Sequence, residues 1–111
     1  MRIRHEDHDR TSIITLTGEF TADQSDQFRR MVMERTQSGV RDLVFVLEEV
    51  PLVDSAALDA LLWAQEHVAE ALGQVRLVRP DENVVTILRL TRLTQQFDCH
   101  DDVTDAVRSL R

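Results

Sequence analysis

The chain has few of the residues that cross-link, interrupt or anchor a protein. Its 111 residues include 2 prolines, 3 glycines and a single cysteine, Cys99. One cysteine allows no internal disulfide, which fits a reducing cytoplasm. No apolar run approaches the length of a membrane span, and the first five residues are too polar for a secretory signal. The sequence therefore predicts a single cytoplasmic domain over residues 1–111.

Positive charge is also scarce. The chain has 13 Lys and Arg residues against 20 Asp and Glu residues, which gives a formal net charge of −7. Nucleic-acid backbones and anionic membranes both attract basic proteins, so neither is an expected partner. The glycine-rich motifs that hold nucleotide phosphates are missing too, and no paired catalytic groups stand out. We therefore expect a protein that binds other proteins, not an enzyme.

The spacing of apolar residues predicts alternating strands and helices. Strands are expected at residues 3–7, 12–17, 43–47, 75–78 and 97–99, and helices at residues 23–37, 55–72, 83–91 and 102–110. Leu72 should close the apolar face of the second helix, and Gly73 should end that helix. This order implies an α/β sandwich with about four helices. Its mixed sheet of about four or five strands begins with an antiparallel hairpin and continues with parallel strands.

One junction stands out, between the apolar strand at residues 43–47 and the helix that follows it. Partners of parallel sheets meet the carboxyl ends of the strands, and the start of a helix there presents free N–H groups and a positive dipole end. We therefore expect the functional surface at this junction. Its predicted residues are Asp54, Ser55, Ala56, Ala57, Leu58, Asp59 and Trp63.

Four short motifs follow one another along nearly the whole chain. They are Leu16-Thr17-Gly18-Glu19-Phe20, residues 43–54, Asp54-Ser55-Ala56-Ala57-Leu58 and Leu90-Thr91-Arg92-Leu93. In this order and spacing they resemble the STAS domain, the fold of bacterial anti-sigma factor antagonists. The resemblance implies a STAS-like sandwich that acts as a non-enzymatic regulatory module, without a cofactor or a metal.

The resemblance also implies a phosphorylation switch, which this sequence alters. In the family the third motif is Asp-Ser-Ser-Gly-Leu, and a partner kinase of the GHKL type, itself the anti-sigma factor, phosphorylates the second serine. The matching residue here is Ala56, which has no hydroxyl group. Ser55 is the hydroxyl left in the motif. It is interpreted either as a displaced phosphoacceptor or as part of a simple helix start, in which Ser55 or Asp54 caps the helix.

Asp59 and Trp63 also have two interpretations each. Asp59 lies three residues after Ala56, so its carboxylate either imitates a phosphate in part or only complements the helix dipole. Trp63 lies off the apolar face of its helix, as an interface anchor or as peripheral core.

Two other groups of polar residues carry less weight. His5 and His8 lie in an extended segment that scatters metal ligands and are expected to form a solvated acidic edge. Cys99, beside His100 and Asp101, is expected to be a small buried hydrophobe.

The resemblance implies an anti-sigma factor of the GHKL kinase type as the partner. An alternative is an accessory subunit of an ABC-type lipid transport complex that docks on the transporter ATPase, since stand-alone STAS proteins there lack the phosphoserine. A third interpretation is a scaffold in a stress-signalling assembly. Direct insertion into a membrane is not expected in any of them.

Overall fold

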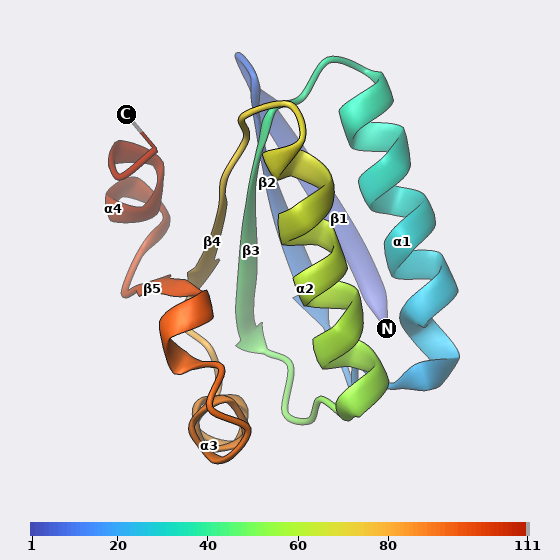
Figure 1. Ribbon diagram of the computed structural model, residues 1–111, viewed down its shortest axis with the longest axis vertical. Coiled ribbons are helices and arrows are strands. Elements are labelled where there is room, and N and C mark those ends of the chain that lie inside the picture. Colours follow the sequence, from blue (N-terminus) through green and yellow to red (C-terminus); the bar gives the residue numbers. More distant parts are fainter. Residues whose placement is uncertain (111) are drawn as a thin grey trace.

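The five strands of the sheet lie side by side in the order in which they occur in the chain (Figure 1). The computed structural model describes residues 1–110. β1 and β2 pair antiparallel, and the other neighbouring strands pair parallel, as predicted. The strands are β1 (Arg2–His8), β2 (Thr11–Thr17), β3 (Asp42–Glu49), β4 (Val75–Val78) and β5 (Asp98–His100).

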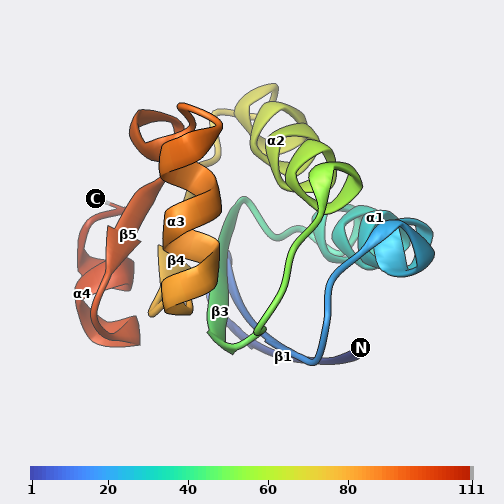
Figure 2. The same cartoon turned by 90° about the horizontal axis from the view of Figure 1, so that it is seen from below.

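Four α-helices cover the sheet unequally in the described part of the chain. They are α1 (Ala22–Gln37), α2 (Ser55–Ala69), α3 (Glu82–Leu90) and α4 (Val103–Arg108), with a short 3₁₀ helix, η1 (Thr94–Gln96), after α3. Buried residues of α1, α2 and α3 join the main core, whereas α4 packs through Ala106 on Val44 and Val78 at the opposite face (Figure 2). The predicted α/β sandwich is confirmed.

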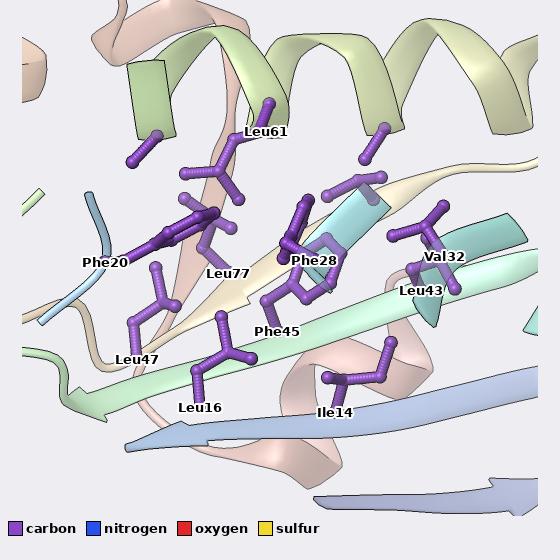
Figure 3. Packing of buried hydrophobic residues seen from close by; sticks show 14 of the residues in the cluster. Ile14, Leu16, Phe20, Phe28, Val32, Leu43, Phe45, Leu47, Leu61 and Leu77 are labelled. Carbon is purple, nitrogen blue, oxygen red and sulfur yellow. The ribbon is translucent and has the colours of Figure 1, made fainter. Parts of the chain in front are cut away.

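The main core lies between the sheet and α1 and α2. Side chains alternate along β2, so Ile14 and Leu16 point into the core while their neighbours are half-buried. Three phenylalanines from different segments meet there: the ring centroids of Phe20 and Phe28 lie 4.8 Å apart, and those of Phe28 and Phe45 lie 5.2 Å apart (Figure 3). Phe20 lies two residues before the first residue of α1, so this contact anchors the chain at the start of that helix in the core.

The end of α2 differs from the prediction. The helix stops at Ala69, and Leu72 lies beyond it with 87% of its surface exposed and a left-handed φ of 65°. Leu72, not Gly73, therefore makes the turn that commonly uses glycine. Gly73 is needed for a different reason, because a Cβ atom there would lie 2.0 Å from the carbonyl oxygen of Arg41.

Two buried charges were not anticipated. Arg76 of β4 is 8% exposed, and its guanidinium donates to the hydroxyl of Ser109 at 2.7 Å, which fastens the end of α4 to the sheet. Asp42, which is 2% exposed, accepts from the backbone N–H of Gln74 at 2.9 Å and joins the starts of β3 and β4. Both groups have partners, as buried polar groups require.

The prediction that Cys99 is buried was wrong. Cys99 is exposed because β5 is a three-residue strand at the edge of the sheet. Desolvation of the sulfur and then the charge of Asp98 raise the pKa of Cys99, so the thiol is protonated at neutral pH.

Candidate partner-binding site

Asp54 joins the N-termini of two helices. As the N-cap of α2, it accepts a hydrogen bond from the backbone N–H of Ala57 at 2.9 Å through Oδ1. Its Oδ2 atom accepts from the backbone N–H of Ala22, in the first turn of α1, also at 2.9 Å. One carboxylate thus satisfies a free N–H group of each helix and faces the positive end of both dipoles.

The backbone brings these two helix starts together. Phe20 and Val53 form a parallel bridge beyond the ends of β2 and β3. The N–H of Phe20 donates to the carbonyl of Leu52 at 2.9 Å, and the N–H of Asp54 donates to the carbonyl of Phe20 at 3.3 Å. As a result α1 and α2 begin side by side at the same end of the molecule (Figures 1 and 2).

The hydrogen bonds to Asp54 favour its ionised form. The hydrogen bond from the N–H of Ala57 makes the largest contribution and lowers the pKa. Desolvation of the carboxyl group raises the pKa and partly opposes this, and the hydrogen bond from the N–H of Ala22 lowers it further. Together they hold the pKa of Asp54 below the ordinary value of 3.8. The carboxylate is therefore charged throughout the physiological range.

The remaining predicted residues divide between the surface and the core. Ser55 and Asp59 are exposed and lie one helical turn apart, with half-buried Ala56 beside them. Ala57 and Leu58 are 0% and 5% exposed, so they anchor the helix in the core. The cap of α2 is Asp54, and Ser55 is the first residue of the helix.

Trp63 lies on the surface between α1 and α2. Its ring stacks on His67, with centroids 5.1 Å apart and planes inclined by 13°. The guanidinium carbon of Arg29 lies 5.1 Å from the ring centroid on the α1 side. The indole is half-buried and also packs against the main core.

Leu52 extends the site beyond the residues predicted from the sequence. It is 41% exposed and precedes Asp54 in the loop after β3. The side-chain amide of Asn83, at the start of α3, donates to the carbonyl of Pro51 at 3.3 Å and holds this loop. Val50, Leu52 and Val53 look equally apolar in sequence, so only the folded loop shows which of them faces solvent.

The histidines of β1 make separate local contacts. His5 Nδ1 lies 3.5 Å from Asp7 Oδ1, and His8 Nε2 lies 3.3 Å from Glu6 Oε1. Within residues 1–110, no three His, Cys, Asp or Glu side chains are grouped to hold a metal ion. No helix in the same range is both long and apolar enough to cross a membrane.

Comparison with known proteins identifies the family. The family model described as STAS domain matches residues 2–106, nearly the whole chain. The chain belongs to the STAS domain family. A Thermotoga maritima relative, provisionally named an anti-sigma factor antagonist, is 24% identical over 100 residues, which are 89% of this chain and 88% of that protein.

Solved structures show the same STAS fold. The crystal structure of TM1081 from Thermotoga maritima has a TM-score of 0.90 and 23% identity, and covers 98% of this chain and 94% of that one. The unphosphorylated anti-sigma factor antagonist SpoIIAA, from Bacillus, has a TM-score of 0.82 and 19% identity, with 99% of both chains covered. Murine Slc26a9, an anion transporter, has a TM-score of 0.79 and 19% identity over 95% of this chain but 18% of its own.

The charge of Asp54 should stabilise this STAS domain in a pH-dependent way. Because the folded pKa lies below the unfolded one, the contribution is fully present above the unfolded value of 3.8 and is lost as pH falls through the folded value. We expect Asp54→Asn to unfold at a lower temperature than the wild type at pH 7. The gap should narrow as pH falls below 3.8.

Thermal unfolding followed by circular dichroism measures this gap, with Asp54→Ala as the matched control. Alanine removes both acceptors, so this variant should remain less stable than the wild type at acid pH as well. A gap for Asp54→Asn that is equal at pH 7 and pH 3 would show that the charge is not engaged.

Proposed function

We propose that this STAS domain is an anti-sigma factor antagonist that binds an anti-sigma factor of the GHKL kinase type through the start of α2. The observation that carries the proposal is that Ser55 and Asp59 are exposed at the start of α2, which follows the loop with exposed Leu52 at the carboxyl end of β3, in a STAS domain that spans residues 2–106. SpoIIAA, a structural neighbour, is named an anti-sigma factor antagonist. An apolar side chain beside polar ones on a rigid helix end suits recognition by a protein.

Ser55 is the residue on which phosphorylation would act in this proposal. Its hydroxyl lies at an exposed helix start, where a kinase could reach it, whereas Ala56 has no acceptor atom. A phosphate adds about −1.5 to −2 charge at neutral pH. Asp54 already faces both helix dipoles and Asp59 lies one turn away, so the added charge would meet two carboxylates and repel a partner fitted to the neutral serine.

The proposal is tested by pull-down of the tagged protein from its own cells, followed by mass spectrometry and by titration of the recovered partner. We expect wild-type protein to recover a GHKL-type kinase and Ser55→Glu to bind it at least about tenfold more weakly, since a carboxylate carries part of the phosphate's charge. Thr104→Glu is the matched control, because Thr104 is exposed on α4 at the opposite face of the sheet.

Other outcomes would contradict this function. Recovery of a transporter ATPase and its permease would support the accessory-subunit interpretation, in which the loop never needs a phosphate. Recovery of a larger signalling assembly without a kinase would support a scaffold. A kinase that binds the wild type and Ser55→Glu equally would show that the start of α2 is not the contact surface.

Asp59 is proposed to weaken the same complex as a permanent substitute for part of the phosphate. Neutralising it with Asp59→Asn should then tighten kinase binding by about fivefold, the scale of one exposed charge contact. Glu66→Gln is the control, because Glu66 is an exposed acid further along α2. Equal affinities of Asp59→Asn and the wild type for the kinase, measured by isothermal titration, would show that Asp59 does not imitate a phosphate. Its charge would then only complement the helix dipole.

A further inference from the structure

β1 is an edge strand without most of the usual protection against pairing with another strand. It has seven residues, contains no proline, and pairs with β2 in an unbroken register from Arg2 to His8. Edge strands are commonly protected by short length, by proline or by a β-bulge, and β1 has none of these. At the opposite edge, β5 has only three residues. Charged side chains are therefore what protects β1.

The charges on β1 do not repel every partner, because they differ in sign. Arg4 and Glu6 are exposed and lie two residues apart, so they project from the same face of the strand. Within residues 1–110 Arg4 has no ion pair, and the one charged partner of Glu6 is the exposed ring of His8, at 3.3 Å. Both charges are available to a second strand.

A second copy of β1 complements this pattern when the two strands run antiparallel around His5. Arg4 of each copy then lies directly opposite Glu6 of the other, and the two-fold symmetry makes this pair twice. Opposite charges at directly facing positions stabilise antiparallel strands. A strand with charges of one sign would have no such register.

The other facing positions do not oppose this arrangement. Ile3 would face Asp7, whose carboxylate is already held by the hydroxyl of Ser12 at 2.6 Å and the guanidinium of Arg35 at 2.7 Å. Arg2 would face His8, and His5 would face its own copy. The net charge of −7 acts against association, but salt at about 0.15 M screens charges more than about 8 Å apart while leaving contacts between facing side chains.

We propose that two copies of this chain associate through β1, so that their sheets join antiparallel across a two-fold axis at His5. The surface is distinct from the start of α2 and does not depend on the proposed function. It leaves Ser55 and Asp59 free in both copies, because those residues lie on α2 and not on the sheet edge.

Charge reversal tests both the association and its register. Arg4→Glu places two acids opposite each other, and Glu6→Arg places two bases opposite each other. Sedimentation velocity at about 0.15 M salt should show a concentration-dependent dimer for the wild type, weakened by about tenfold or more in each variant.

A mixture of the two variants should dimerise again. The acid introduced into one chain then faces the base introduced into the other, and the native Glu6 of the first chain faces the native Arg4 of the second. Arg89→Glu and Glu70→Arg carry the same charge changes at exposed sites away from β1 and should behave as the wild type.

Each result decides the proposal. A wild type that is monomeric up to about 1 mM, the weak end of measurable association, would overturn it. So would a dimer that tolerates both reversals, or a mixture of the variants that stays monomeric while both remain folded by circular dichroism.

A second measurement does not rely on charge. His5→Cys in a Cys99→Ser background should form a covalent dimer on oxidation, since facing residues of antiparallel strands lie within disulfide range. Arg10→Cys, beyond the strand, should not.

Discussion

The carboxylate of Asp54 holds together the end of the molecule on which the proposed function depends. It accepts one N–H from α1 and one from α2, although Ala22 and Asp54 are 32 residues apart in the chain. The parallel bridge between Phe20 and Val53 places the two helix starts side by side. The ring of Phe20 packs on the ring of Phe28, which links this bridge to the core. The surface around Ser55 is therefore fixed by the same contacts that pack α1 and α2 on the sheet. A partner would meet a preformed surface, which lowers the entropy lost on binding.

The same interaction sets the electrostatics of the site. A helix N-terminus ordinarily attracts anions, and two adjacent N-termini would do so more strongly. Here Asp54 already occupies that position and is ionised, because the N–H of Ala57 above all stabilises its charge. A phosphate on Ser55 would add charge to a site that is already compensated, so its main effect would fall on the partner and not on the fold. The proposed phosphorylation of Ser55 would therefore leave the fold of this domain intact.

Much of the fold could be predicted from the sequence, because strand and helix periods are local properties. The alternation in β2 and the apolar run of β3 predicted the element order, and a polar cap candidate after β3 placed Asp54 at a helix start. The second hydrogen bond of Asp54, to Ala22, has no local signal and depends on how β2 and β3 pair. Similarly, the turn at Leu72 and the exposure of Cys99 follow from the close approach of Gly73 to Arg41 and from the edge position of β5. Both are decided by tertiary contacts.

One carboxylate, that of Asp54, binds the N-termini of both α1 and α2. This double contact is tested most directly by an NMR titration that follows the Asp54 carboxyl carbon together with the amide protons of Ala22 and Ala57. All three signals should titrate together, with a common pKa below 3.8. If the amide proton of Ala22 does not titrate with the Asp54 carboxyl, Asp54 does not bind the N-terminus of α1. The contact that holds the starts of α1 and α2 together would then be absent, and the proposed binding surface would not be fixed.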